Sequence, residues 1–261
     1  MLSKARVAQL RSLSRRDARR REGIYLIEGA RLVREALASQ AAISEVLLTA
    51  EAAASPLGVE IAGLAGDLGV DLTDISDKDC RRIADTKSPQ GIVALVRRSG
   101  PDPDILAGPG LYLALDGVAN PGNVGTLLRS ADAFGVRAVL GGPGTADFEN
   151  GKTLRAAMGS GFHVPAVEVD DFPGALRRMK EAGAVLLAAV MDGEDPLGAA
   201  APSDFAVVIL GNEAHGVSRR ALALADRKVT IPCPGRAESL NVAMAGAFLL
   251  SALCRPAGGG N

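Results

Sequence analysis

The chain has 261 residues, of which 48% are hydrophobic and 23% charged, and this excludes a disordered, collagen-like or low-complexity protein. Its 29 Lys and Arg side chains balance 30 Asp and Glu side chains, so the whole molecule is not a polycation. The three cysteines lie far apart, without CxxC or Cys/His spacing, so we expect neither a disulfide framework nor a metal site.

Basic residues are concentrated at the N-terminus. Residues 1–34 carry ten Lys or Arg side chains against three acidic ones, and no apolar run follows that would form a secretory signal. The segment is a candidate phosphate-binding patch, although a solvated surface helix explains the charge equally well. The longest uncharged stretch, residues 239–254, is too short to cross a bilayer as a helix, so we expect a cytoplasmic protein that does not enter membranes.

Residues 1–97 are predicted to form a mixed α/β domain. Residues 24–27 predict a short strand, and residues 28–38 predict a helix with apolar spacing through Leu32, Val33 and Leu37. Residues 46–49 and 91–96 predict further strands. A segment rich in Pro, Gly and Asp follows at residues 98–110 and predicts a linker.

Residues 111–261 are predicted to form a second domain around a parallel sheet. Mostly apolar runs separated by helical segments occur at residues 111–116, 138–140, 164–169, 185–190, 205–210 and 228–231. Short apolar strands alternating with helices indicate a parallel sheet covered on both faces. Ligands of such sheets bind beyond the carboxyl ends of the strands, so the loops after these strands are the candidate sites.

The first candidate loop spans residues 116–135. Asn120, Pro121 and Gly122 predict a turn, and a helix is expected from about Asn123. Arg129 lies nearly two helical turns later, where it can flank the apolar face. A capped helix with one surface arginine is the alternative interpretation.

The second candidate loop spans residues 207–218. Gly211 and Gly216 bracket polar residues at the end of an apolar strand, which suits a ligand that touches the backbone. Glu213 has no basic neighbour before Arg219. His215 is expected at a helix entry or on the surface rather than as a catalytic base.

The third candidate loop lies within residues 229–253. Ser239 is predicted to cap a helix that begins with Leu240. Asn241 then stands at the mouth of a buried helix, where a polar group needs a partner. The alternative is that both polar side chains face water at a frayed helix start.

Residues 146–153 fit a relaxed phosphate-loop pattern, which would indicate a nucleotide-binding ATPase. The pattern lacks its first glycine, and Asp147 and Glu149 place negative charge where backbone N–H groups would cradle phosphates. We therefore disfavour this interpretation.

The three candidate loops together resemble the SpoU/TrmH family of RNA 2′-O-methyltransferases in the SPOUT superfamily. The resemblance rests on NPGNVGTLLRSADAFG, ILGNEAHGVS and IPCPGRAESLNVAMAGAFL, in this order and spacing. The N-terminal part is similar to the RNA-binding domain of the family through YLIEGARLVREAL and SPQGIVALV. The resemblance implies an α/β methyltransferase domain with a deep trefoil knot, a smaller N-terminal α/β RNA-binding domain, bound S-adenosylmethionine, no metal and a homodimer.

The resemblance also implies roles for individual residues. The catalytic candidates are Arg129, Asn123, Glu213, Ser239 and Asn241, and the candidate cofactor contacts are Leu210, Gly211, Asn212, Gly216, Ile231 and Leu240. The candidate RNA contacts are Arg15, Arg16, Arg19, Arg20 and Arg155.

The expected activity is methylation of a ribose 2′-hydroxyl in RNA. Ribosomal RNA is the favoured substrate because a separate N-terminal domain with a basic segment suits a folded RNA. Transfer RNA is the second candidate. A catalytically silent RNA-binding protein on the same scaffold is a further alternative, and the intact catalytic set argues against it.

Overall fold

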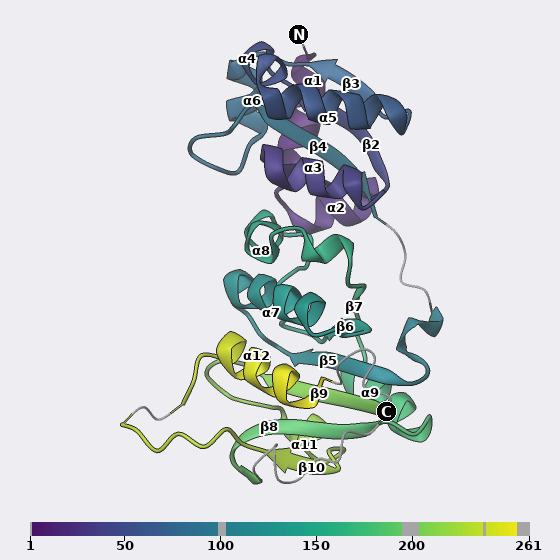
Figure 1. Cartoon of the computed structure of the whole chain (residues 1–261), viewed down its shortest axis with the longest axis vertical. Coiled ribbons are helices and arrows are strands. Elements are labelled where there is room, and N and C mark those ends of the chain that lie inside the picture. The colour runs from purple at the N-terminus through teal and green to yellow at the C-terminus, as the bar shows by residue number, and fades with distance from the viewer. Residues whose placement is uncertain (1, 99–102, 195–203, 237–238, 255–261) are drawn as a thin grey trace, which may run out of the picture. The chain divides into compact units, whose positions relative to one another are not determined.

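The computed structural model describes residues 2–98, 103–194, 204–236 and 239–254. The chain forms two compact units (Figure 1). The N-terminal unit comprises residues 1–100 and 149–162, and the C-terminal unit comprises residues 101–148 and 163–261. Residues 149–162 therefore depart from the linear division predicted from the sequence, which assigned them to the second domain.

The N-terminal unit is built on a four-stranded sheet in the order β1-β4-β2-β3. Strand β4 runs antiparallel to β1 and β2, and β3 runs parallel to β2. The strands are β1 (Ile24–Glu28), β2 (Ile43–Leu48), β3 (Asp71–Asp74) and β4 (Ile92–Arg97). Three of them confirm the predictions. The exposed edge strand β3 was not predicted, because its sequence DLTD carries no apolar run.

Helices cover both faces of this sheet. They are α1 (Lys4–Ser12), α2 (Arg16–Glu22), α3 (Ala30–Ala38), α4 (Ala50–Ala54), α5 (Pro56–Asp67), α6 (Asp77–Ile83) and α8 (Gly151–Ala157), followed by the 3₁₀ turn η2 (Ser160–Phe162). Buried residues of α3 and α5 form one core cluster with the sheet. Residues of α1 and α6 form the other core cluster with Leu47, Val93 and Leu95. Alternate residues of β1, β2 and β4 thus face opposite helical layers.

Residues 149–162 join the N-terminal unit through packing and charge. Leu154 of α8 is buried in the α3–α5 core cluster. Glu149 accepts a hydrogen bond from Arg98 Nε at 2.6 Å, and Arg155 Nη2 lies 3.1 Å from Asp85 Oδ2. No local sequence pattern predicts these two charged contacts, because the partners lie more than 50 positions apart in the sequence.

The C-terminal unit contains a six-stranded sheet in the order β10-β8-β9-β5-β6-β7, and every neighbouring pair is parallel. The strands are β5 (Gly110–Asp116), β6 (Ala138–Gly141), β7 (Ala166–Glu168), β8 (Val185–Glu194), β9 (Phe205–Gly211) and β10 (Arg227–Val229). All six predicted strands and the parallel sheet are confirmed, with boundaries that shift by a few residues.

Helices pack on the two faces of the sheet, as predicted. The helices are α7 (Pro121–Ala133), α9 (Phe172–Glu181), α11 (Arg219–Leu222) and α12 (Val242–Leu253), and η1 (Pro103–Leu106) precedes β5. Ile209 faces α9 and α11 in a buried cluster. The next residue, Leu210, points to the other face, where its side chain lies against Gly246 of α12 beside Leu127 of α7. Among the described residues, no helix is long and apolar enough to cross a membrane.

Candidate functional site

A cavity of about 890 Å³ lies at the carboxyl ends of β8, β9 and β10. Its wall is formed by residues 189–192, 210–217, 229–233 and 239–242, with Ala245 and Leu249 of α12. The volume falls in the range of sites for small molecules and cofactors. The position is the one predicted from the parallel sheet.

The structure brings most of the predicted site residues together at this cavity. The wall includes all six candidate cofactor contacts, Leu210, Gly211, Asn212, Gly216, Ile231 and Leu240, and three catalytic candidates, Glu213, Ser239 and Asn241. Asn123 and Arg129 are not part of the wall.

Gly211 ends β9 where two backbone segments meet. A Cβ atom at this position would lie 2.0 Å from the carbonyl carbon of Gly216 and 2.1 Å from the amide nitrogen of Val217. Asn212 and Gly216 exchange backbone hydrogen bonds of 3.0 and 2.8 Å across the loop. The loop therefore folds back on its own strand, and its close approach requires glycine at position 211.

The side chain of Asn212 holds the loop in shape. Its Oδ1 accepts hydrogen bonds from the N–H groups of Ala214 at 2.9 Å and His215 at 3.2 Å. Its Nδ2 donates to the carbonyl oxygen of Gly117 at 2.8 Å. Asn212 thus ties the end of β9 to the loop after β5, which is the neighbouring strand.

Glu213 holds the start of α7 in place. Its carboxylate accepts hydrogen bonds from the N–H groups of Ala119 and Asn120, both at 3.1 Å, and from Asn123 Nδ2 at 2.9 Å. Partial burial acts to raise the pKa of Glu213, but the hydrogen bond from Asn123 and those from the backbone outweigh it and lower the pKa below its ordinary value. The carboxylate is therefore ionised at neutral pH.

Asn123 links this carboxylate to the last helix. Its Oδ1 accepts a hydrogen bond of 3.2 Å from Asn241 Nδ2. Asn241 Oδ1 accepts from the N–H group of Ala243 at 2.9 Å and so caps α12. Loops 90 and 118 residues apart in sequence are thereby joined in one network.

The predicted cap of the last helix was wrong. The helix begins at Val242 rather than Leu240, and Asn241 is its N-cap in place of Ser239. An asparagine side chain caps as well as a serine, and at position 241 its amide group also reaches Asn123. Ser239 stays exposed in the cavity wall.

Helix α7 begins two residues earlier than predicted. Asn120 caps it by accepting from the N–H group of Gly122 at 2.8 Å, and Pro121 takes the first position, which suits proline. Arg129 lies in the second half of this helix and is exposed. Within the described part of the chain its guanidinium makes no hydrogen bond or ion pair, so it is available to a ligand.

The cavity wall carries two carboxylates and an imidazole. Asp192 and Glu213 contribute the carboxylates and His215 the imidazole, and no Lys or Arg is among the described lining residues. Asp192 and Met191 lie on β8, whose end was not chosen from the sequence. The rule that ligands bind at the carboxyl ends of parallel strands could have pointed to them. Such a wall suits a ligand that carries positive charge.

The predicted RNA contacts all lie in the N-terminal unit and divide into two groups. Arg15, Arg16 and Arg20 are exposed. Arg19 is only 3% exposed, and its Nη1 donates to the carbonyl oxygens of Leu13 and Ser14 at 2.7 and 2.9 Å. Its guanidinium thus holds the turn between α1 and α2 instead of facing a ligand. Arg155 is engaged by Asp85.

Comparisons with known proteins agree on one family. The sequence model of the SpoU rRNA Methylase family matches residues 110–251, and that of the MRM3-like substrate binding domain matches residues 4–94. The chain is 35% identical over 245 residues to the 23S rRNA (guanosine(2553)-2′-O)-methyltransferase RlmP of Bacillus subtilis, and the match covers 94% of each chain. It is 36% identical over 146 residues to the 23S rRNA (guanosine-2′-O-)-methyltransferase RlmB of Neisseria meningitidis, which is 56% of this chain and 58% of that one.

Solved structures show the same relationship. The SpoU methyltransferase AviRb from Streptomyces viridochromogenes, in complex with AdoMet, is 27% identical with a TM-score of 0.85, covering 97% of both chains. The AdoMet-bound rRNA methyltransferase from Sinorhizobium meliloti is 28% identical with a TM-score of 0.84, covering 97% of this chain and 95% of that one.

Proposed function

This chain belongs to the SpoU rRNA methylase family, as an RNA 2′-O-methyltransferase that uses S-adenosylmethionine, and we propose that its substrate is ribosomal RNA. The observation that carries the proposal is the cavity at the strand ends, whose wall is connected by hydrogen bonds to the start of α7. The relatives named as acting on 23S rRNA support the choice of substrate. We also propose a cytoplasmic location, which a ribosomal RNA substrate supports.

The cavity fits S-adenosylmethionine by size and charge. Apolar side chains such as Ile231, Leu240 and Leu249 offer packing for a flat base. Carboxylates in a wall without Lys or Arg among its described residues suit a molecule that carries a positively charged sulfur. The tight turn at Gly211 places backbone of residues 211–216 in the cavity wall, where the predicted cofactor contacts require it. We propose that Leu210, Gly211, Asn212, Gly216, Ile231 and Leu240 hold the cofactor.

When bound, the cofactor supplies a methyl group that is activated by its positive sulfur. The transfer forms a bond between the ribose 2′-oxygen and the methyl carbon, breaks the bond from that carbon to sulfur, and releases the hydroxyl proton. The protein must therefore align the 2′-oxygen and stabilise the charge that develops on it. We assign alignment to Asn123, Ser239 and Asn241, with Glu213 as a positioning residue that orients Asn123.

We assign charge stabilisation to Arg129 as a hydrogen-bond donor to the developing oxyanion. A role as general base would require the guanidinium to lose a proton at neutral pH, which is costly because arginine stays protonated in proteins. Donation of a hydrogen bond leaves its charge in place. An RNA phosphate or water then accepts the proton.

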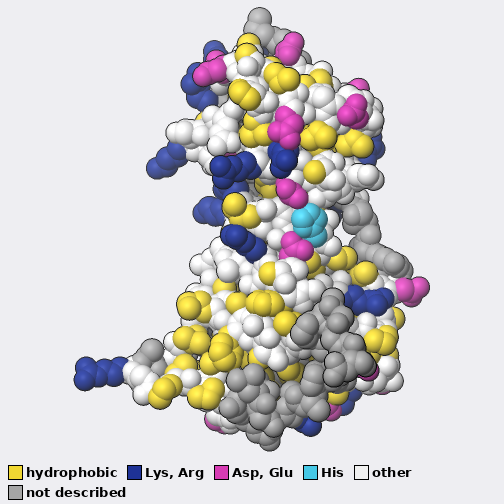
Figure 2. All heavy atoms as spheres, viewed as in Figure 1, with side chains coloured by type: hydrophobic (Ala, Val, Ile, Leu, Met, Phe, Trp, Pro, Cys, Tyr) yellow, Lys and Arg dark blue, Asp and Glu magenta, His cyan; other side chains and the backbone are white. Residues whose placement is uncertain are grey.

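We further propose that the enzyme works as a homodimer through α12. Met244 is 64% exposed and Phe248 is 42% exposed, and they lie one helical turn apart. Hydrophobic side chains gather on the face of the C-terminal unit over this helix (Figure 2). Exposed apolar patches of this kind mark interaction sites.

The proposed trefoil knot concerns the chain between β10 and α12. Strand β10 lies at the edge of the sheet, whereas α12 packs on α7 and on the central strand β9. The chain must therefore return from the edge to the middle through the cavity wall, which is compatible with the knot of this family. We propose that residues 98–110 link this methyltransferase domain to an RNA-binding domain at residues 1–97.

The test is transfer of a labelled methyl group from S-adenosylmethionine to unmodified ribosomal RNA and, in parallel, to transfer RNA. The control variants are Arg129→Ala and Arg177→Ala, the latter removing an exposed arginine of α9. We expect label in ribosomal RNA that is lost in Arg129→Ala and kept in Arg177→Ala. Label in transfer RNA alone would show that transfer RNA, not ribosomal RNA, is the substrate. RNA binding without label in either pool would favour a catalytically silent RNA-binding protein.

A further inference from the structure

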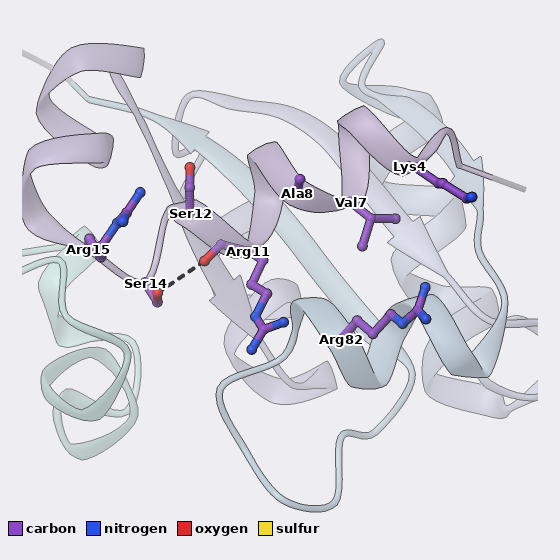
Figure 3. Close-up of a pocket in the computed structure, with 8 residues that line it drawn as sticks. All are labelled: Lys4, Val7, Ala8, Arg11, Ser12, Ser14, Arg15 and Arg82. Carbon is purple, nitrogen blue, oxygen red and sulfur yellow. Dashed lines mark hydrogen bonds between the residues drawn. The ribbon is translucent and has the colours of Figure 1, made fainter.

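A second hollow lies on the N-terminal unit, between α1, the turn before α2, and α6. It has a volume of about 510 Å³ and is lined by Lys4, Val7, Ala8, Arg11, Ser12, Ser14, Arg15 and Arg82. Figure 3 shows Lys4 and Arg11 on α1, Arg15 at the turn, and Arg82 on α6. We call these four side chains and the space between them the α1–α6 groove.

The charges of the α1–α6 groove are not balanced. None of its eight lining residues is acidic, and four are basic. In the described part of the chain, the side chains of Lys4, Arg11 and Arg15 make no ion pair. Arg82 Nη1 lies 3.9 Å from Asp79 Oδ1, which is too far for a hydrogen bond.

Other basic residues of the same unit differ from these four. Arg6, also on α1, contacts Glu45 and donates to Gln9 Oε1 at 2.9 Å. Arg34 Nε lies 2.6 Å from Glu60 Oε1. Among the described residues, Lys4, Arg11 and Arg15 therefore have no acidic partner, and Arg82 has only the distant contact with Asp79. Mutual repulsion of such charges destabilises a fold unless an anion is bound.

The form of the groove favours an extended anion over a single phosphate. The cations come from two helices and a turn, so they do not converge on one point. The hydroxyl groups of Ser12 and Ser14 already donate to the carbonyl oxygens of Gln9 and Arg11, at 2.7 and 3.0 Å. The groove therefore offers several separated positive charges and no free serine hydroxyl to fix one phosphate. Such an arrangement suits the regularly spaced charges of a phosphodiester chain.

We propose that the α1–α6 groove binds the phosphate backbone of the RNA substrate. The inference rests on the proposed function for the identity of the RNA. It also changes the set of contacts: Arg15 stays, Arg19 is replaced because it is buried, and Lys4, Arg11 and Arg82 are added. Helix α6 thereby becomes part of the binding surface.

Ala8 provides a sharp test because it lies in the groove, is exposed, and stands between Lys4 and Arg11 on α1. Ala8→Glu places a carboxylate four residues after Lys4 and three before Arg11, where it pairs with both and supports the helix. Ala8→Gln has nearly the same shape without the charge and is the matched control. Loss of RNA binding in a variant that is as stable as the control separates ligand binding from folding.

The measurement is filter binding of an unmodified ribosomal RNA transcript over a series of KCl concentrations, with S-adenosylmethionine affinity and Tm in parallel. Each phosphate contact contributes about 0.7–0.9 to the slope of log K against log salt. For Ala8→Glu we expect at least about tenfold weaker binding at 100 mM KCl and a slope smaller by roughly 1.5–2. Cofactor affinity and Tm should match those of Ala8→Gln.

A second variant removes the charges themselves. Lys4→Gln with Arg11→Gln and Arg82→Gln should weaken RNA binding likewise. Arg177→Gln with Arg178→Gln and Arg220→Gln, which removes three exposed charges from the other unit, should not. If Ala8→Glu binds RNA as tightly as Ala8→Gln, with the wild-type salt slope, the α1–α6 groove does not bind the RNA backbone. The proposed methyl transfer is not affected by that result.

Binding is measured independently of transfer, so the two proposals fail separately. Wild-type protein that binds RNA through the groove but transfers no label would contradict the proposed function and keep the groove. If the wild-type protein does not bind the transcript, the proposal that the α1–α6 groove binds RNA is refuted.

Discussion

Three polar side chains beyond the carboxyl ends of the strands depend on one another. Glu213 accepts from Asn123, and Asn123 accepts from Asn241. Asn241 also caps its own helix through Oδ1, and the orientation of Asn123 is determined from both sides by Glu213 and Asn241. This is how a site is preorganised before substrate arrives, since the positions of the donors need not change during the reaction.

The pKa of Glu213 leads to a prediction about pH. Because the pKa is lowered in the folded state, the ionised carboxylate stabilises the fold above the unfolded pKa of about 4.3, and this contribution is lost as pH falls through the lower, folded pKa. Glu213→Gln should reduce Tm at pH 7, by an amount equivalent to about 1 kcal/mol or less because the site is exposed. The Tm difference from wild type should shrink at pH 3.

The matched control for this prediction is Glu181→Gln, an exposed glutamate of α9 that makes no hydrogen bond in the described part of the chain. It should leave Tm nearly unchanged at both pH values. A Tm difference for Glu213→Gln that grows as the pH falls would contradict the assigned network.

Arg129 carries a second prediction at this scale. Arg129→Ala should lower kcat by about 10²–10³, the loss seen when an oxyanion donor is removed. Affinity for S-adenosylmethionine, measured by calorimetry, should stay within about twofold, because Arg129 is not in the cavity wall. Arg129→Lys with near-full kcat and an unchanged pH profile would show that the guanidinium group is not needed.

Among the elements, α12 contacts the site at its N-cap and the neighbouring elements further along. Its N-cap, Asn241, contacts Asn123, and its Gly246 lies against Leu127 of α7 and Leu210 of β9. The close approach of α12 to the sheet at this glycine therefore fixes the position of the cavity wall relative to the start of α7. Because the packing is dense, a small shift of α12 would also move the cavity wall.

Gly246→Ala tests this role. The added Cβ would lie 2.3 Å from Leu127 Cδ2 and 2.7 Å from Leu210 Cδ1, and both leucines are buried. We expect destabilisation of about 1–3 kcal/mol, which is typical of overpacking, together with weaker S-adenosylmethionine binding. Chemical denaturation and calorimetry provide the two measurements.

The control is Gly63→Ala in α5, where a Cβ meets nothing within 4 Å. It should stabilise the protein by about 0.5–1 kcal/mol, since glycine is unfavourable inside a helix. Equal changes in the free energy of unfolding for the two substitutions would mean that α12 can shift to accommodate the added Cβ without loss of stability.

For the whole molecule, the proposed dimer makes the exposed face of α12 an interface. Met244→Glu with Phe248→Glu should convert a dimer into a monomer in sedimentation velocity experiments, because charges would be buried against apolar surface. Val59→Glu, which changes a side chain that is 61% exposed on α5, should leave the dimer intact. A wild-type protein that sediments as a monomer at micromolar concentration would refute the interface.

Much of the fold could be predicted from the sequence because the relevant signals are local. Apolar runs and the helices between them identified all six strands of the parallel sheet, and the three motifs at their ends located the cavity. The predictions failed where a local sequence pattern was weak or was compatible with two different structures. Strand β3 has no apolar run, and both Ser239 and Asn241 could serve as a cap.

The sequence by itself determined the sheet, the family and the loops that form the cavity, because periodicity and motif spacing act over a few residues. Only the tertiary structure decided which distant residues meet. It placed residues 149–162 in the N-terminal unit, joined Asn123 to Asn241 across 118 positions, buried Arg19 and brought Arg82 beside α1. These outcomes depend on how whole elements pack, and the free energy of packing is a property of surfaces that no single segment contains.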